Sequence, residues 1–162
     1  MSYVDNHLAP DEQVAFVTRL HPVIFTSAAG FAAFVVLAAT LIIRHNDLPS
    51  ETNRLVALVG GAIAIVSLIP PFVRWQTSEF AVTDRRVLVK VGFLSVHTVE
   101  LLLAKVEAIG VDQTLGGRLL GYGTLRITGT GGTVESFPLV ARPLMLRDAV
   151  LRQTQAAAPR QR

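Results

Sequence analysis

The stretch from Gln113 to Leu125, QTLGGRLLGYGTL, is the first place to look for phosphate binding, because it combines four glycines with a basic residue. A P-loop needs its glycines to be followed by Lys and then Ser or Thr at a helix start, and a dinucleotide site needs a strand–helix–strand unit. Neither pattern is found here. We therefore interpret the stretch as a structural corner, in which glycines permit positive φ or close backbone contact. Its members are Gly117, Gly121, Tyr122 and Gly123.

Three further side chains of this corner have their own expected roles. Residues 115–120 can form about one helical turn, and we expect Leu119 and Leu120 to point into the domain. Arg118 has two roles open to it. It can brace the corner by donating to backbone carbonyls, which we favour because a guanidinium has about five donors that nearby carbonyls satisfy easily. Alternatively, it faces lipid headgroups.

Residues that could bind a metal or perform acid–base catalysis are present but form no recognisable pattern. Metal ligands on a helix need i, i+4 spacing or a Cys partner, and the chain has no Cys. The histidines are scattered: His7, His21, His45 and His97. The carboxylates after the apolar part show no paired motif either: Glu79, Asp84, Glu100, Glu107, Asp112, Glu135 and Asp148. We expect no enzyme, no metal and no cofactor. Arg126 beside Tyr122 is too little for nucleic-acid binding, which needs basic residues interleaved with stacking aromatics.

Two long apolar runs precede these residues and dominate the composition. The chain is 17% charged, against roughly 25% for an ordinary soluble domain. Residues 22–43 contain no charge, and as a helix they would be about 33 Å long; residues 55–73 form a second run. The alternative is a pair of buried core helices, but such helices should carry a polar stripe. We predict a transmembrane hairpin over residues 22–73.

Details of the hairpin follow from its small residues, prolines and flanking charges. Pro70 and Pro71 should kink or end the second helix. Small residues recur at four-residue spacing, which either allows close helix packing in lipid or reflects only their abundance: Ala29 with Ala33, Ala57 with Gly61, and Gly60 with Ala64. Basic residues favour the cytoplasmic side of a membrane. The link has Arg44 and Arg54, whereas the other side has five: Arg19, Arg74, Arg85, Arg86 and Lys90. Both termini are therefore expected in the cytoplasm.

The pattern changes to alternation with a period of two after Trp75, which predicts about six short antiparallel strands in a small barrel or sandwich. The expected strands are residues 77–83, 86–92, 95–103, 106–113, 124–128 and 133–140. A helix begins at Pro143, which suits a first helical position. The expected division is a cytoplasmic segment 1–21, the hairpin, a domain 74–155 and a disordered tail 156–162.

The same residues resemble the second type of bacterial pleckstrin-homology-like (PH-like) domain. That family reads T-x-x-R, then G-L-L, then E-x-P-L-x-K-I, then Q-x-x-x-G-R-L-L-G-Y-G-T. The matching positions are Thr83, Arg86, Gly92, Phe93, Leu94, Glu100, Leu103, Lys105, Val106, Gln113 and Gly117 through Thr124. Leu102 stands where the family often has Pro, and residues 8–22 resemble the segment before the family's paired membrane helices. The resemblance implies a bent barrel of about seven strands capped by a C-terminal helix, a bacterial inner-membrane location and no established activity.

The functional hypotheses follow from this resemblance and from the charges. Arg74, Arg85, Arg86 and Lys90 either hold the domain against an anionic inner leaflet or are ordinary flanking charge. The first hypothesis is a non-enzymatic, membrane-anchored interaction module that binds a protein partner, itself or anionic lipid headgroups. The alternatives are an accessory subunit of a membrane transport or export complex, and a hidden hydrolase or transferase.

Overall fold

The computed structural model describes residues 8–9, 11–46, 49–92 and 97–157. The chain divides into two compact units. One, the helical unit, is residues 22–76; the other, the β unit, combines residues 1–21 with residues 77–162. The expected tail, 156–162, lies outside the described residues from position 158 onward, and the last helix continues to Ala157.

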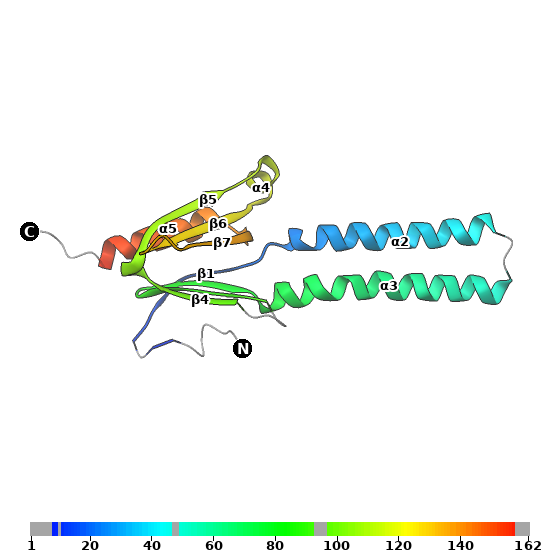
Figure 1. Ribbon diagram of the computed structural model, residues 1–162, viewed down its shortest axis with the longest axis horizontal. Helices are drawn as coiled ribbons and strands as arrows, with labels where there is room; N and C mark the ends of the chain where they lie inside the picture. The colour runs from blue at the N-terminus through cyan, green and yellow to red at the C-terminus, as the bar shows by residue number, and fades with distance from the viewer. Residues whose placement is uncertain (1–7, 10, 47–48, 93–96, 158–162) are drawn as a thin grey trace, which may run out of the picture. The chain divides into compact units, whose positions relative to one another are not determined.

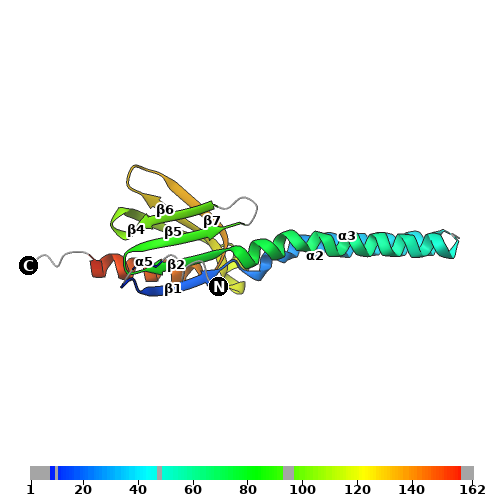
Figure 2. The ribbon, with the colours of Figure 1, turned by 90° about the horizontal axis from the view of Figure 1, so that it is seen from below.

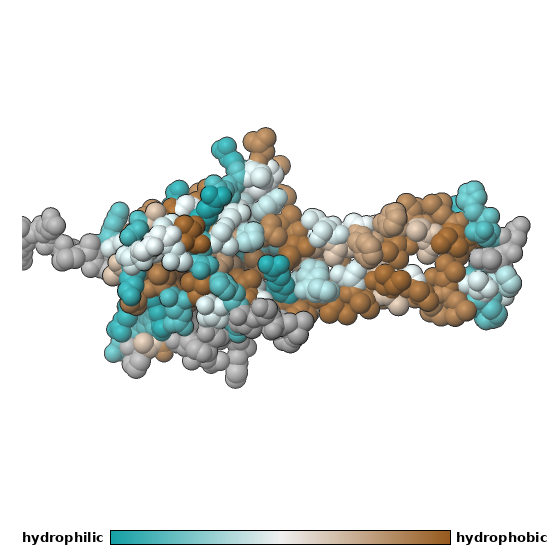
Figure 3. Space-filling view, viewed as in Figure 1, coloured by the Kyte–Doolittle hydropathy of each residue, from teal (hydrophilic) through white to brown (hydrophobic). Residues whose placement is uncertain are grey.

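The helical unit consists of a short 3-10 turn η1 (Pro22–Phe25) and two long helices, α2 (Thr26–His45) and α3 (Ser50–Thr77). Both helices are long and apolar enough to cross a membrane, and their hydrophobic residues lie on the surface (Figure 3). In the most apolar stretch of the first helix, 0% of the residues are buried. In the most apolar stretch of the second helix, 11% are buried. The expectation that the prolines would end the second helix is wrong, because α3 continues through Pro70 and Pro71.

The two helices approach each other closely at a glycine. Gly60 and Ala64 are the buried residues of α3, and a Cβ on Gly60 would lie 3.1 Å from the Cβ of Ala39 in α2. At the other end of the hairpin, Phe25 and Trp75 meet edge to face at 6.2 Å. Of the expected small-residue pairs, Gly60 with Ala64 therefore lies at the interface. Small side chains let helix backbones come close enough for dense packing.

The β unit contains seven described strands in two antiparallel sheets (Figure 1). The first sheet has the order β1 (Val14–Arg19), β2 (Glu79–Thr83), β3 (Arg86–Val91), β4 (His97–Leu102). The second has the order β5 (Val106–Asp112), β6 (Tyr122–Gly129), β7 (Val134–Ala141). The remaining elements are η2 (Leu103–Lys105), α4 (Leu115–Leu120) and α5 (Pro143–Ala157). The 3-10 turn η2 lies between β4 and β5, and the short helix α4 lies between β5 and β6.

The strand β1 is a correction to the expected division of the chain. Residues 1–21 were expected to be a segment separate from the domain, but β1 pairs along its length with β2, with Arg19 opposite Glu79. In the sequence, the helical hairpin therefore lies between β1 and β2, two strands that are hydrogen-bonded neighbours in one sheet. This pairing is hard to predict from sequence, because the partner of β1 lies about sixty residues away in the chain, beyond the hairpin.

The described strands form two sheets, which agrees with the sandwich alternative of the strand pattern, and no closed barrel is shown among them. At one side the ladder is interrupted between β4 and β5 by η2. At the other side β1 and β7 meet through an isolated bridge between Leu20 and Val140. One side-chain bond supports this seam, from the Thr18 hydroxyl to the Ala141 carbonyl at 2.7 Å. Figure 1 shows the two sheets as two layers, and Figure 2 views them face-on, so that their strands overlap.

The core lies between the two sheets and α5. Phe80 of β2 meets Phe137 of β7 edge to face at 5.8 Å, and Leu146 and Val150 of α5 are fully buried. This helix contacts strands of both sheets, which agrees with the predicted C-terminal helix. All five residues of β2 are buried, because the N-terminal segment covers its outer side, with Leu8 against Ala81. The N-terminal segment is thus part of the fold.

Candidate functional site

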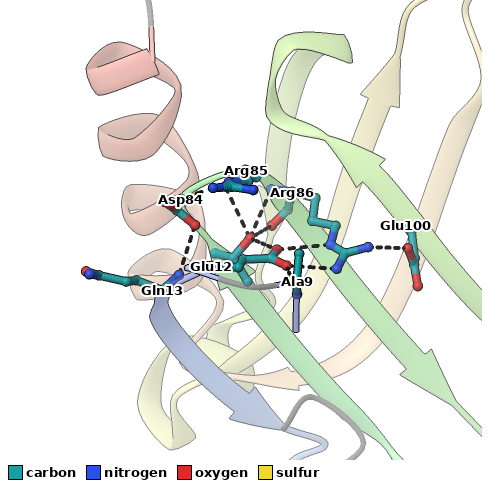
Figure 4. Close-up of polar contacts among 8 residues, drawn as sticks. Ala9, Glu12, Gln13, Asp84, Arg85, Arg86 and Glu100 are labelled. Atoms are coloured by element: carbon teal, nitrogen blue, oxygen red, sulfur yellow. Dashed lines mark hydrogen bonds and ion pairs between the residues drawn. The ribbon is translucent and has the colours of Figure 1, made fainter. Parts of the chain in front are cut away.

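A buried carboxylate, Glu12, is the centre of the densest polar cluster in the β unit (Figure 4). Its side chain is 1% exposed. Arg86 donates to it twice, from Nε to Oε1 at 3.0 Å and from Nη2 to Oε2 at 2.8 Å. The Ala9 amide donates to Oε2 at 2.8 Å, and the Thr83 hydroxyl donates to Oε1 at 2.7 Å. Each oxygen therefore accepts two hydrogen bonds, as a buried carboxylate requires.

The β2–β3 turn positions two of the donors to Glu12, Thr83 and Arg86. Thr83 is the last residue of β2, and its hydroxyl oxygen accepts from the backbone N–H of Arg85 at 3.2 Å and of Arg86 at 3.0 Å. These bonds close a tight turn of the kind that Thr forms with following amides. The turn places Arg86 at the start of β3, where its Nη1 also donates to Glu100 of β4 at 2.8 Å. Asp84 completes the cluster by accepting from the Gln13 amide at 3.1 Å.

The hydrogen bonds from Arg86 lower the pKa of Glu12 from 4.5 to about 2. Desolvation acts in the opposite direction but is outweighed. The same contact raises the pKa of Arg86. A carboxylate that stays ionised to such low pH is a poor general base near neutrality, where the most effective catalytic groups have a pKa close to the working pH. The cluster therefore fastens the N-terminal segment to the β2–β3 turn.

The glycine corner has an ordered geometry around α4. The Thr114 side chain caps the helix by accepting from the Gly117 amide at 3.1 Å. Gly121 ends the helix with a φ of 79°, in the left-handed region that glycine adopts freely. Gln113 then joins the two sides of the corner, because its Nε2 donates to the Tyr122 carbonyl at 2.8 Å. The Tyr122 ring lies 5.2 Å from that of His21.

Two glycines of this corner leave no room for a side chain. A Cβ on Gly117 would lie 2.6 Å from the Tyr122 carbonyl oxygen. A Cβ on Gly123 would lie 2.8 Å from the Asp112 carbonyl oxygen. Both contacts are with backbone atoms, which cannot move aside without distorting the strands. The corner is therefore built by close approach of the chain to itself.

One comparison with known proteins found a match. The family model of the bacterial PH domain matches residues 23–158. The chain belongs to the bacterial PH domain family. No curated protein and no solved structure matched. The match includes Thr83, Arg86 and the glycine corner, whose roles in this PH domain are the turn, the Glu12 ion pair and the tight α4 connection. PH-like domains are generally non-catalytic.

The leucines of α4 correct one expectation. Leu119 and Leu120 were expected to point into the domain, but they are 87% and 56% exposed. Leu115, at the start of the same helix, is 84% exposed. Gly117, in contrast, is buried. Residues 115 and 119 share a face of the helix, because they are four positions apart. Because the opposite side, at Gly117, packs on Tyr122, this leucine face points away from the PH domain.

Arg118 does not brace the corner in the structure. Its side chain is exposed and makes no hydrogen bond or ion pair within the described ranges. Gln113 braces the corner instead, through its bond to the Tyr122 carbonyl. The sequence analysis names Gln113 only as a match to the family pattern. The amide of Gln113 is long enough to reach a carbonyl across the corner, and it is closer than Arg118 to the strand that it joins. This leaves the other role that was considered for Arg118, on the outer surface.

The other candidate basic residues do not form one cluster in the PH domain. Arg86 is engaged by Glu12 and Glu100. Arg85 is exposed in the β2–β3 turn, 4.0 Å from Asp84. Lys90 lies at the opposite end of β3, opposite Glu79. Arg74 belongs to α3 in the helical unit. Arg85, Arg86 and Lys90 are close in sequence, but they do not form one basic surface on the PH domain.

Metal-ligating side chains remain dispersed in the part of the chain that the structure describes. Among residues 8–9, 11–46, 49–92 and 97–157, no group of three or more His, Cys, Asp or Glu residues could hold a metal ion. One of the histidines, His97, instead lies 3.3 Å from Glu135 across the two sheets.

Proposed function

We propose that this chain is a membrane-anchored, non-enzymatic interaction module, in which a helical hairpin holds a PH domain at the cytoplasmic face of a bacterial inner membrane. The observation that carries the proposal is the insertion of two apolar, surface-exposed helices between β1 and β2. A chain that leaves a sheet, forms two such helices and returns to the neighbouring strand has the covalent layout of an anchored domain. Its surface would bind a protein partner, a second copy or anionic lipid headgroups.

Two other interpretations of the apolar helices fit the structure less well. A core helix of a soluble protein is mostly buried, whereas these helices expose large residues such as Phe34 and Leu58 along their length. A cleaved signal sequence would remove β1, whose pairing with β2 and whose neighbour Glu12 hold the sheet together. Exposed apolar helices of this length match the thickness of a bilayer core, which is about 30 Å.

The absence of cysteine makes a clean test of this proposal possible. Single cysteines are introduced as His45→Cys at the end of α2 and as Ser136→Cys on the exposed surface of β7. We expect the chain to stay in the membrane pellet after an alkaline wash. A membrane-impermeant maleimide applied to intact cells with a permeable outer envelope should label position 45, and it should label position 136 only after the inner membrane is opened.

Three results would count against the proposal. Release of the chain by the alkaline wash would show that it is not anchored. Labelling of position 136 in intact cells would place the PH domain on the other side of the membrane. Purification in mild detergent with a stoichiometric set of transporter subunits would favour the alternative, an accessory subunit of a transport or export complex.

A further inference from the structure

The leucine face of α4 is an apolar surface on an otherwise polar part of the PH domain. We define the leucine face as Leu115, Leu119 and Leu120. Figure 3 shows hydrophobic atoms projecting at the position of α4, beside hydrophilic ones. Singly exposed apolar residues are ordinary, but three on one short turn need an explanation. The glycines of the corner and the Gln113 side chain hold α4 in the position that exposes these leucines.

The leucine face lies at the end of the β unit from which the chain passes to the hairpin. His21, the last residue of this part of the unit, donates its amide to the Leu139 carbonyl at 2.7 Å and its ring lies 5.2 Å from Tyr122, two residues after α4. Pro22, the next residue, already begins η1. On the return, α3 ends at Thr77 and β2 begins at Glu79. His21 and Pro22 are consecutive, and Ser78 is the residue between α3 and β2, so both connections are short.

Two arginines lie near the leucine face. Arg118 is on α4 itself, and the Arg142 backbone amide donates to the Gly121 carbonyl at the end of α4, at 2.8 Å. The exposed Arg142 guanidinium lies over the ring of Phe16, 6.0 Å from its centroid. Both arginines, with Gln113, line a pocket of about 260 Å³ whose far wall contains the exposed Leu144 and Met145. Apolar side chains next to basic ones suit a membrane interface, where the former enter the acyl boundary and the latter meet headgroup phosphates.

We propose that α4 inserts its leucine face into the interface of the membrane that holds the hairpin, with Arg118 and Arg142 against anionic headgroups. This inference rests on the proposed function, because it needs the hairpin to be in the bilayer. With no linker between His21 and Pro22, a hairpin in the membrane keeps the α4 end of the PH domain at the surface. A lipid surface is therefore the occupant that chain connectivity brings to this face. The PH domain would then have a third attachment to the membrane, which fixes its orientation.

Three single-cysteine variants of the full chain test this proposal, each labelled with a fluorophore that is sensitive to polarity. Leu119→Cys reports on the leucine face and Leu37→Cys, in the middle of α2, reports on hairpin insertion. Leu102→Cys is the matched control, because Leu102 is also an exposed leucine, 49% exposed. It is the last residue of β4 and pairs with Arg86, at the end of the β unit far from the chain's passage to the hairpin. The chains are reconstituted in phosphatidylcholine–phosphatidylglycerol vesicles with and without brominated acyl chains.

We expect the emission at positions 37 and 119 to shift to shorter wavelength and to be quenched by the brominated lipids, while position 102 stays unshifted and unquenched. Quenching at 37 without quenching at 119 would overturn the inference and leave the anchor intact. A short-wavelength shift at 119 without lipid quenching would show that a protein surface, such as a second copy, covers the face, and would also overturn it. No quenching at 37 would reject the anchor and the inference together.

The arginines are tested in the same system. In the Leu119→Cys chain, Arg118→Gln with Arg142→Gln should reduce quenching to the level measured in pure phosphatidylcholine vesicles. Arg85→Gln, at the far end of the β unit, should leave it unchanged. Equal quenching in neutral and anionic vesicles would show that headgroup charge has no part in the contact. Circular dichroism of each variant confirms that the fold is retained.

Discussion

The residue with the clearest physical task is Glu12, which holds the N-terminal segment to the β2–β3 turn. Replacement by Gln removes the carboxylate that accepts two hydrogen bonds from Arg86, whose guanidinium is partly buried. Loss of one partner from such a pair costs about 3 kcal/mol. Amide hydrogen exchange of β1 in the full chain should therefore accelerate by about a hundredfold. Glu100→Gln is the control, because that carboxylate is 40% exposed, and should have an effect below about 1 kcal/mol.

The same carboxylate predicts how the stability of β1 depends on pH. The folded-state pKa of Glu12 is about 2, below the ordinary value of 4.5. Its stabilising contribution is therefore complete above pH 4.5 and is lost as the pH falls toward 2. Protection of the β1 amides, corrected for intrinsic exchange, should decline over this window in the wild-type chain. In Glu12→Gln the decline should be much smaller; an identical decline in both chains would assign it to other carboxylates.

The glycine corner gives a second residue-scale prediction. Gly117→Ala places a methyl group 2.6 Å from the Tyr122 carbonyl oxygen, and overpacking of this kind costs about 1–3 kcal/mol. Gly116→Ala is the matched control, because its Cβ would meet only the Tyr122 hydroxyl at 3.8 Å. Thermal unfolding of the detergent-solubilised chain should show a lower midpoint for position 117 and an unchanged or higher one for position 116. Equal midpoints would mean that the corner can relax.

The sequence identified these glycines but not the direction of the side chains between them. The amphipathic expectation for a short turn placed Leu119 inward, toward a core. The helical spacing predicts a different direction for these side chains, because residues 115 and 119 share one face of the helix and residue 117 lies on the opposite face. Once Gly117 is known to pack on the backbone, Leu115 and Leu119 must face outward. Glu12 could not have been found in this way, because its side-chain partners Thr83 and Arg86 are more than seventy residues distant and no local pattern links them.

At the scale of elements, alternation predicted the strands well wherever one face is buried. In β6, Leu125 and Ile127 are buried and Arg126 is exposed, as the period of two requires. It failed for β1, since a strand that precedes a long apolar run resembles a simple flank. It also did not reveal that α3 continues through two prolines, which packing against α2 and the apolar surroundings of a helical hairpin allow.

The contact between α2 and α3 supplies a prediction at this scale. Gly60→Val places a side chain where even a Cβ lies 3.1 Å from that of Ala39, so the helices must separate. Gly61→Val makes the same change one residue on, where nothing lies within 4 Å. Both changes have the same intrinsic effect on helix propensity. The thermal midpoint of helix unfolding in detergent should fall for position 60 alone, and equal midpoints would show that Gly60 is not at a helix contact.

At the scale of the whole molecule, the PH domain is discontinuous in sequence, because its first strand comes before the hairpin and the rest comes after it. This arrangement explains why the Glu12 cluster and the pairing of β1 with β2 are needed. They join chain segments that the hairpin separates by 55 residues, from Pro22 to Gln76. It also means that the residues after the hairpin do not contain a complete sheet, since without β1 the edge of β2 is open. Open edges of this kind promote aggregation.

The discontinuity leads to a decisive deletion experiment. Residues 22–77 are replaced by a Gly-Ser loop of about four residues, a length that joins antiparallel strands well. Because Arg19 lies opposite Glu79 in the register, the loop should close β1 and β2 into an ordinary hairpin. We expect a monomeric domain that stays soluble without detergent and shows a cooperative thermal transition. Residues 77–157 alone, which lack β1 and Glu12, should aggregate or unfold with no such transition. If that fragment folds as stably as the rejoined domain, β1 is not an integral strand and the inserted hairpin does not divide the fold.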